Sequence, residues 1–468
     1  MNRDIVIIGG GPGGYVAAIR GAQLGYNVTL IEKHKIGGTC LNYGCIPTKA
    51  LYRNAEILNT LKNIDEYGIS VDNYSFDIEK IQSRKAEVVN QLVTGIEQLL
   101  NSNNIEVIEG TASFLDKNTL KVIKTDGNEE QISAKNIVIA TGSKAFLPNI
   151  EGIDLDGVYT SKELLDFEEV PKRLVVAGGG VIGMEMAGIF NSLGSEVSVI
   201  HSRKYLLKQI DKDVSKRFAS YIKKQGTKVI TSSRISKIEK AELGLKVYFT
   251  DKKGEKHLDA DAVLISTGRR PVVDGLNLES IGIEYDDRGI KVDNNFMTNV
   301  EGIYAIGDVN GQMMLAHVAS HQGITAVDNI AGLPNEVNYD VVPNCIFVFP
   351  EIAASGITED MAKENEIECK ASKFLFRANG KALALGEPEG FVKVISDMDD
   401  KIIGVQIMGP HASDLIHEGT LAINKELSVT DISHTIHAHP TLSEAFMEAT
   451  MGLNDTAIHL APLKGRRK

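Results

Sequence analysis

A glycine fingerprint occurs twice in this chain, each time between an apolar run and an expected helix. Residues 9–14 read GGGPGG after the apolar run 5–8, and residues 178–183 read GGGVIG after the run 174–177. In a strand, turn and helix unit, the first glycine makes the tight turn, the second lets the backbone approach a pyrophosphate and the third packs the helix on the strand. The repeat therefore predicts two dinucleotide sites, with glycines Gly9, Gly11 and Gly14 in one and Gly178, Gly180 and Gly183 in the other.

The residue that ends the second strand differs between the two copies. Glu32 ends this strand in the first copy, where a carboxylate can accept hydrogen bonds from both hydroxyls of an adenosine ribose. His201 ends it in the second copy, and Ser202, Arg203 and Lys204 follow. A carboxylate at this position would hold the ribose of NAD and repel the 2′-phosphate of NADP. Because His201 stands there instead, close to the cations Arg203 and Lys204, NADP remains an alternative to NAD.

Two cysteines follow the first fingerprint closely. Cys40 and Cys45 lie in the segment 37–49, which reads GGTCLNYGCIPTK. On one helical turn their sulfurs can close a disulfide, and thiol exchange at that disulfide could couple to a bound redox cofactor. A structural disulfide or half of a metal site is the alternative, although Cys345 and Cys369 stand apart in the sequence and complete no metal-spaced cluster.

Length, charge and cysteine usage limit the kind of protein that carries these motifs. About three domains of ordinary size are expected for 468 residues. The formal net charge of −12 disfavours nucleic acid as the main partner, and the basic tail 464–468 is interpreted as a solvated end. Four cysteines do not make a secreted disulfide framework, the start shows no cleavable signal and the apolar runs are shorter than a membrane span. A cytoplasmic protein without membrane insertion is therefore expected.

Three further apolar strands end in tight turns. The segments 137–143 and 262–268 are interpreted as paired crossings between domains that bracket the second nucleotide-binding domain. The segment 303–306 closes on Gly307 and Asp308, which places a carboxylate at the C-terminal end of a strand, where open α/β sheets bind ligands. Asp308 can either hydrogen-bond a polyol chain or cap a helix N-terminus, and the sequence alone favours neither.

The C-terminal stretch from about residue 343 has a different pattern. Strand-like runs at 391–395 and 402–407 accompany a helical run at 413–424, which predicts a mixed α+β module. Near its end His439 precedes a proline, and a helix that begins after residue 441 or 442 would carry Glu444 in its first turn. Contact with Glu444 would fix the tautomer of His439 and raise the basicity of its imidazole. A surface histidine is the alternative, and a metal site on His437 and His439 lacks a third ligand nearby in the sequence.

Taken together, these motifs resemble the flavoprotein disulfide reductases, that is, the pyridine nucleotide-disulfide oxidoreductase family, from Asp4 to about Pro462. The resemblance is carried by the second fingerprint with Glu185 and by the segments 37–49, 140–142, 268–271, 307–308, 314–317 and 439–444. Within the family, 40–49 and 314–317 are similar to the branch that oxidises dihydrolipoamide, whereas the mercuric branch would have a C-terminal cysteine pair. The chain departs from the family at His201, where an acidic residue is usual, and at 321–323, which read HQG where EEG is frequent.

The resemblance implies an α/β fold with two Rossmann-like dinucleotide-binding domains and a C-terminal α+β dimerisation domain. The implied boundaries are 1–143 and 269–341 for the FAD-binding and central parts, 144–268 for the NAD(P)-binding domain and 342–468 for the dimerisation domain. A homodimer is implied because the family's histidine acts across a two-fold interface. The implied partner is the lipoyl domain of an acyltransferase or of a glycine cleavage carrier protein, with no nucleic acid, membrane or metal involved.

The resemblance also implies a role for each motif residue. Cys40 would be the interchange thiol and Cys45 the thiol nearer the flavin, while His439 of the partner subunit would act as base and Glu444 would orient it. Lys49 and Glu185 would flank the reactive flavin nitrogen. The implied cofactor contacts are Gly9, Gly11, Gly14, Glu32, Lys49, Thr141, Gly142, Asp308 and Ala316 for FAD, and Gly178, Gly180, Gly183, Glu185, His201 and Gly268 for NAD or NADP.

Two other functions, one enzymatic and one structural, remain as alternatives to dihydrolipoamide oxidation. One is another disulfide reductase of the family, similar to glutathione reductase, which an assay with lipoamide against oxidised glutathione would separate. The other is a flavoprotein kept as a structural subunit of a large complex, which the retention of both cysteines, His439 and Glu444 disfavours.

Overall fold

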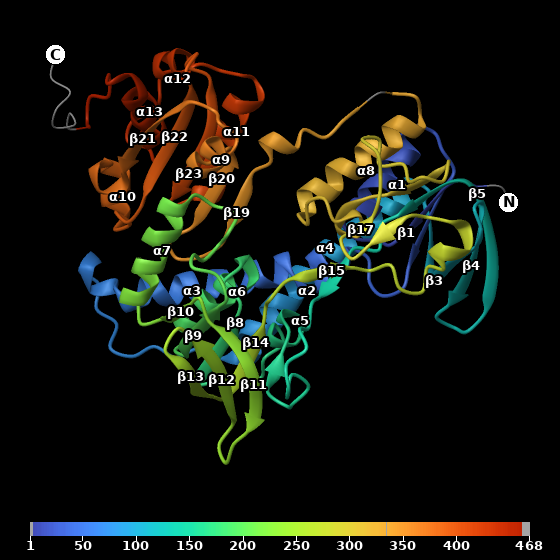
Figure 1. The fold of residues 1–468 in the computed structure, drawn as a ribbon, viewed down its shortest axis with the longest axis horizontal. Helices are drawn as coiled ribbons and strands as arrows, with labels where there is room; N and C mark the ends of the chain where they lie inside the picture. The colour runs from blue at the N-terminus through green and yellow to red at the C-terminus, as the bar shows by residue number, and fades with distance from the viewer. Residues whose placement is uncertain (1–2, 334, 461–468) are drawn as a thin grey trace. The chain divides into compact units, whose positions relative to one another are not determined.

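The computed structural model describes residues 3–333 and 335–460, which form two compact units (Figure 1). Unit 1 contains the chain up to residue 148 together with 159–169 and 266–337, and unit 2 contains 149–158, 170–265 and the chain from 338 onward. The basic tail 464–468, expected to be a solvated end, lies outside the described residues. No helix within 3–333 and 335–460 is long and apolar enough to cross a membrane.

Unit 1 is built on a parallel sheet in the order β3-β2-β1-β5-β18, in which every neighbouring pair is parallel. β3 and β5 are long enough to leave this layer and pair through β4 in an antiparallel meander. Strands β1 and β2 are almost entirely buried, as expected for a parallel sheet that is covered on both faces. The bounds are β1 (Arg3–Ile8), β2 (Val28–Glu32), β3 (Glu106–Asp116), β4 (Thr119–Lys124), β5 (Glu129–Ile139) and β18 (Ile303–Ala305).

The helices of unit 1 include α1, which directly follows the first fingerprint, and α8, which packs beside it (Figure 1). An ion pair between Arg20 and Asp328 at 2.6 Å joins these two helices. The helices are α1 (Pro12–Gln23), α2 (Gly38–Tyr43), α3 (Cys45–Lys62), α4 (Ile78–Ser102), α5 (Ser161–Leu164) and α8 (Ala316–Ile330). Two short ribbons complete the unit: β6 (Ser143–Ala145) with β15 (Arg269–Pro271), and β16 (Tyr285–Asp286) with β17 (Gly289–Ile290).

The first part of unit 2 repeats the fingerprint arrangement on a second parallel sheet, β10-β9-β8-β14, with β7 at its end. An antiparallel meander, β11-β12-β13, accompanies it and shares an apolar core with β8 and β14. The helices are α6 (Val181–Ser192) and α7 (Lys212–Lys224), and the strands are β7 (Val158–Tyr159), β8 (Arg173–Ala177), β9 (Glu196–His201), β10 (Lys228–Thr231), β11 (Arg234–Lys240), β12 (Leu245–Asp251), β13 (Gly254–Ala260) and β14 (Ala262–Ile265).

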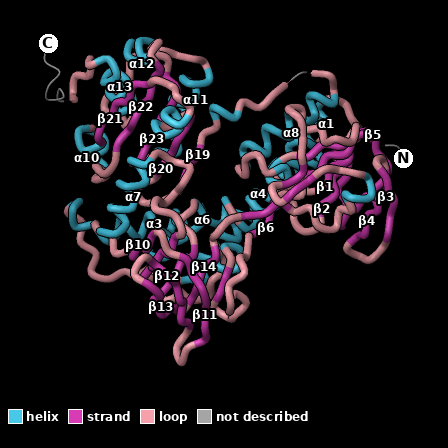
Figure 2. The backbone as a smooth tube through the Cα atoms, in the orientation of Figure 1, coloured by secondary structure: helices cyan, strands magenta, loops and turns pink. Residues whose placement is uncertain are grey.

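The second part of unit 2 is an antiparallel sheet, β19-β20-β23-β22-β21, with helices packed against it (Figure 2). Its core is formed by side chains of β22, β23, α11 and α13. The bounds are β19 (Asn344–Ile346), β20 (Ile352–Gly356), β21 (Cys369–Leu375), β22 (Phe391–Asp397), β23 (Ile402–Met408), α9 (Glu359–Glu364), α10 (Gly380–Leu385), α11 (Ala412–Asn424), α12 (Val429–His434) and α13 (Glu444–Met451).

A buried charge cluster joins the two parts of unit 2. Lys393, on strand β22 between β23 and β21, is fully buried and donates to Asp211 at 2.8 Å, to Asp213 at 3.4 Å and to Glu359. Asp211 is itself buried and caps the N-terminus of α7. Burial lowers the pKa of Lys393, but its bonds to Asp211 and Glu359 outweigh burial and the pKa is raised overall. The ammonium group is therefore held in its charged form.

Candidate active site

The cysteine pair lies where two helices of unit 1 meet. Cys40 is in α2, and Cys45 is the first residue of α3. The sequence suggested that both lie on one helical turn, but Gly44 interrupts the helix with φ −147° and ψ −106°. The interruption places Cys45 at a helix N-terminus, whose dipole favours an anionic sulfur.

The two thiols interact directly. A side-chain hydrogen bond with Cys45 and burial both raise the pKa of the Cys40 thiol, while the positive charge of Lys49 opposes this. Lys49 lies one turn beyond Cys45 on α3, so it faces the same side of the helix.

The first fingerprint forms a tight loop with an open centre. A Cβ atom at Gly14 would lie 1.8 Å from the carbonyl oxygen of Gly9, so only glycine fits there, whereas a Cβ at Gly11 would meet nothing within 4 Å. Gly11 is also the N-cap of α1, whose free N–H groups are suited to bind an anion. Glu32 holds this loop, because its carboxylate accepts from Gly10 N at 2.6 Å and from His34 N at 2.8 Å. The open space fits the approach of a dinucleotide pyrophosphate.

The second fingerprint has the same loop but a different side chain behind it. Gly180 caps α6 as Gly11 caps α1, and a Cβ there would also meet nothing within 4 Å. His201 replaces the carboxylate: its Nδ1 accepts from Gly179 N at 3.1 Å and its Nε2 lies 3.1 Å from the carbonyl oxygen of Tyr205. Only a neutral imidazole protonated at Nε2 satisfies both contacts. Burial lowers the pKa of His201, and the charge of Arg203 adds to this effect.

Asp308 belongs to a network that the sequence did not reveal. The carboxylate accepts from the Ser143 hydroxyl and lies 3.9 Å from Arg269, whose Nε and Nη2 donate to Ser143 Oγ and Ser143 O at 2.7 Å each. Asp308 lies inside the short 3₁₀ helix Gly307–Asn310 rather than at the N-cap of a helix. Burial lowers the pKa of the Arg269 guanidinium, whereas the charges of Asp308 and Cys45 raise it. Arg269 is therefore close enough to Cys45 for their charges to interact.

The remaining motif residues of unit 1 lie in turns or at the start of a helix. Thr141 donates to Val272 O at 2.6 Å, and Gly142 has a φ of 71° in the turn before β6. Ala316 is the first residue of α8. Gly268 precedes β15 and accepts from Phe146 N at 2.9 Å.

Within unit 2, Glu185 is buried on α6 and accepts from Phe347 N at 3.0 Å. That bond ties the second fingerprint helix to the C-terminal part of the chain. Its expected place beside a flavin nitrogen, together with Lys49, stays a prediction.

His439 and Glu444 are in direct contact in the C-terminal part of unit 2. Nδ1 of His439 lies 2.8 Å from Glu444 Oε1, and Glu444 Oε2 accepts from Thr441 N at 2.8 Å. α13 begins at Glu444, so this carboxylate lies in the first helical turn as the sequence indicated. The bonds from Thr441 and His439 hold the pKa of Glu444 below its usual value, although burial opposes them. His439 is 78% exposed, which leaves Nε2 accessible from outside.

The side chain of His437 has a different environment from that of His439. Its side chain is 4% exposed, its Nε2 lies 2.8 Å from Glu418 Oε1 and its Nδ1 lies 2.9 Å from Thr435 O. Both ring nitrogens are thus engaged, Nε2 by a side chain of α11 and Nδ1 by the backbone of the loop before His439. A metal site shared by His437 and His439 does not fit these contacts, and His437 instead anchors the loop.

The comparisons with known proteins cover nearly the whole chain. Residues 3–323 match the family described as "Pyridine nucleotide-disulphide oxidoreductase", and residues 342–450 match its dimerisation domain. The chain belongs to this family. Its α/β fold with two Rossmann-like domains and a C-terminal α+β dimerisation domain, predicted from the sequence, is confirmed.

Several known proteins are similar to the chain over nearly their full length. It is 44% identical to a dihydrolipoyl dehydrogenase of Bacillus subtilis, with 98% of each chain covered, and 42% identical to that of Chlamydia trachomatis, with 98% of this chain and 99% of the relative covered. Among solved structures, LpdA from Mycobacterium tuberculosis matches with a TM-score of 0.90 and 26% identity, covering 96% of this chain and 99% of that one. The HOCl-induced flavoprotein disulfide reductase RclA from Escherichia coli, in its Cu(II) complex, matches with a TM-score of 0.87 and 29% identity, covering 96% and 99%.

Proposed function

We propose that this chain oxidises protein-bound dihydrolipoamide through a Cys40–Cys45 disulfide and passes the electrons by way of FAD to NAD⁺. The structural observation that carries this proposal is the direct interaction of the Cys40 and Cys45 thiols at the start of α3. The substrate is supported by relatives that are named dihydrolipoyl dehydrogenase and are 41–44% identical over 97–98% of this chain.

The residues present fit the two cofactors. Gly11 and Gly180 leave open space at the N-termini of α1 and α6, where the pyrophosphates of FAD and of NAD⁺ would lie. The carboxylates of Glu32 and Asp308 would accept hydrogen bonds from hydroxyl groups of FAD. The other residues of the set proposed for FAD are Gly9, Gly14, Lys49, Thr141, Gly142 and Ala316. The second set consists of Gly178, Gly183, Glu185, His201 and Gly268. FAD, when bound, accepts two electrons from the dithiol and delivers them as hydride to NAD⁺.

The protein residues carry out the thiol chemistry. A dihydrolipoamide thiolate attacks Cys40 of the disulfide, which forms a mixed disulfide and releases Cys45 as a thiolate. The second thiol of the substrate then attacks the substrate sulfur that is bonded to Cys40. This step closes the lipoamide ring and releases Cys40 as a thiolate. Nε2 of His439 takes the proton from the attacking thiol, and Glu444 on Nδ1 keeps Nε2 unprotonated and stabilises the imidazolium that forms.

The proposed assembly is a homodimer in which His439 of the partner subunit serves each cysteine pair. The match of 342–450 to the family's dimerisation domain supports it. The lipoyl domain of an acyltransferase or of a glycine cleavage carrier protein is the proposed protein partner, and the cytoplasm is the proposed compartment.

A spectrophotometric assay tests the substrate. The FAD-loaded protein should reduce NAD⁺ with dihydrolipoamide and should show no comparable turnover with NADH or NADPH and oxidised glutathione. The opposite ranking would favour the alternative, a disulfide reductase similar to glutathione reductase. Turnover with neither substrate would reject both.

A further inference from the structure

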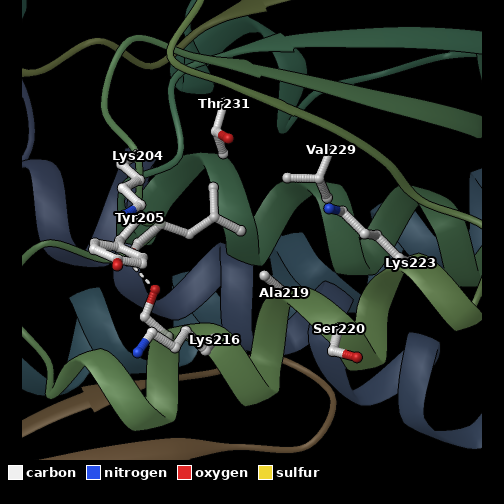
Figure 3. Close-up of a pocket in the computed structure, with 10 residues that line it drawn as sticks. Lys204, Tyr205, Lys216, Ala219, Ser220, Lys223, Val229 and Thr231 are labelled. Atoms are coloured by element: carbon white, nitrogen blue, oxygen red, sulfur yellow. Dashed lines mark hydrogen bonds between the residues drawn. The ribbon is translucent and has the colours of Figure 1, made fainter.

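A pocket of about 290 Å³ lies in unit 2 between α7 and β10 (Figure 3). The segment after β9 that lines it is bonded to the second glycine fingerprint, residues 178–183 and below called the coenzyme loop, through Leu207 N and Gly179 O. The walls of the pocket come from three segments: the residues after β9, one face of α7 and the edge strand β10. None of the ten side chains that line it is acidic. They are Lys204, Tyr205, Leu206, Ser215, Lys216, Ala219, Ser220, Lys223, Val229 and Thr231.

Three ammonium groups give this pocket a positive potential. Lys204 and Lys216 lie on one side with Tyr205, and Lys223 lies on the other side, toward Val229 (Figure 3). The ammonium groups of Lys204 and Lys216 lie 5.1 and 5.8 Å from the centre of the Tyr205 ring. A hydrogen bond from Lys204 and the charges of nearby lysines lower the pKa of the Tyr205 hydroxyl. The chain as a whole is acidic, with a net charge of −12, so this local excess of positive charge runs against its composition.

The rest of the lining suits a phosphate ester. The hydroxyl groups of Tyr205, Ser220 and Thr231 can donate to phosphate oxygens, while lysine binds phosphate as a point charge. Leu206, Ala219 and Val229 supply an apolar floor, which an inorganic ion alone would not use. Its volume of about 290 Å³ lies just below the range of roughly 300–1,000 Å³ for small-molecule sites, which suits a phosphoryl group better than a whole drug-sized ligand.

We propose that this pocket binds the phosphoryl group of a small phosphorylated ligand. Two sources share this chemistry. One is the 2′-phosphate of NADP, because His201 at the coenzyme loop contacts the backbone of Tyr205, and the other is a free phosphorylated metabolite. The binding does not depend on the proposed oxidoreductase activity, and it is measured separately from turnover.

Calorimetric titration of the FAD-loaded dimer with inorganic pyrophosphate tests the site. Saturating NAD⁺ is present throughout, so that the pyrophosphate cannot occupy the coenzyme loop. One binding event per chain is expected. Lys223→Glu and, independently, Lys216→Glu should each weaken it by about tenfold or more, since each reverses a charge at the pocket.

Lys224→Glu is the matched control. It makes the same charge change one residue further along the last turn of α7, on an exposed side chain that does not line the pocket. Its affinity for pyrophosphate should stay within about twofold of the parent. Absence of binding to the parent, or equal weakening by Lys223→Glu and Lys224→Glu, would overturn the proposal.

Replacing NAD⁺ by saturating NADP⁺ identifies the source of the phosphate. If the 2′-phosphate reaches the pocket, pyrophosphate no longer binds. If the natural ligand is a separate metabolite, pyrophosphate binds the NADP⁺ complex as it binds the NAD⁺ complex. Both results support a phosphoryl site, and each assigns it to one source.

Discussion

The imidazole of His201 accepts a hydrogen bond from the backbone of Gly179, in the same place where the carboxylate of Glu32 accepts from Gly10. Two nucleotide loops of one chain thus use the same backbone contact with different acceptors. The carboxylate of Glu32 keeps lone pairs for further donors, whereas the imidazole of His201 offers a single acceptor and has used it. Coenzyme selection at the second loop is therefore expected to differ from that of a relative with an acid there.

Restoring an acid at this position should sharpen coenzyme selection. His201→Glu should raise the ratio of kcat/KM for NAD⁺ over that for NADP⁺, because a carboxylate accepts from the ribose hydroxyls and repels a 2′-phosphate. Steady-state kinetics with both coenzymes measure this ratio. If it is unchanged, the discrimination lies with Arg203 or Lys204 instead.

Acidification should weaken NAD⁺ binding through the same histidine. Burial lowers the pKa of His201 below the ordinary value of about 6.5. The ring of the folded protein therefore stays neutral until the pH has fallen below about 6.5. Protonation of Nδ1 then removes the acceptor of Gly179 N, and the KM for NAD⁺ should rise. As the pH falls, the unfolded chain binds this proton near about pH 6.5, whereas the folded chain binds it only at lower pH. The free energy of unfolding therefore also decreases as the pH falls below about 6.5.

His201→Gln provides the comparison for the pH experiment. Its amide oxygen can accept from Gly179 and its NH₂ group can donate to Tyr205, but the side chain does not titrate. The KM for NAD⁺ in this variant should lose the acid-side increase. An identical pH profile in parent and variant would place the titrating group elsewhere.

The two cysteines should respond differently to replacement by serine. Cys45→Ser should abolish both turnover and the long-wavelength charge-transfer band of the two-electron-reduced protein, because the band needs a thiolate against the flavin. Cys40→Ser should also abolish turnover but retain a thiolate at Cys45, so charge transfer can appear without reductant. Absorption spectra of both variants test the assignment, which a persistent band in Cys45→Ser would contradict.

Loss of the base should affect the lipoamide half-reaction and leave flavin binding intact. His439→Gln should slow that half-reaction by about two to four orders of magnitude, the usual range for a general acid–base group. Glu444→Gln should cost less, since Glu444 orients the ring at 2.8 Å and does not carry the proton. Stopped-flow reduction by dihydrolipoamide measures both, and a nearly unchanged rate in His439→Gln would make this residue structural.

Removing the buried lysine should destabilise unit 2. Lys393→Met leaves Asp211 buried without its counter-ion, which costs about 3–5 kcal/mol when one partner of a buried pair is lost. Lys373→Met is the control, because Lys373 also pairs with Asp213 but is 39% exposed and should contribute at most about 1 kcal/mol. Thermal unfolding should show a clearly larger decrease in Tm for Lys393→Met, and equal decreases would contradict the role assigned to burial.

The sequence predicted the parts of this protein that depend on short-range patterns. Both fingerprints, the carboxylate at Glu32 and the helix that begins near Glu444 follow from residue types at fixed local spacing. The contacts that were missed join distant positions: Ser143 with Asp308 and Arg269, or Lys393 with Asp211. Serine, lysine and arginine at these positions carry no local signal, since only the folded sheet brings them together. The break at Gly44 was missed because the short spacing of Cys40 and Cys45 also suits one continuous turn.

The last strand of the first parallel sheet has a consequence for biosynthesis. β18 comes from residues 303–305, after the whole segment 170–265 of unit 2, whereas β8, β9, β10 and β14 all lie between residues 173 and 265. A nascent chain leaving the ribosome therefore carries every one of these four strands before it carries the last strand of the first sheet. The unit that begins first along the chain is completed only after the second nucleotide sheet has been synthesised.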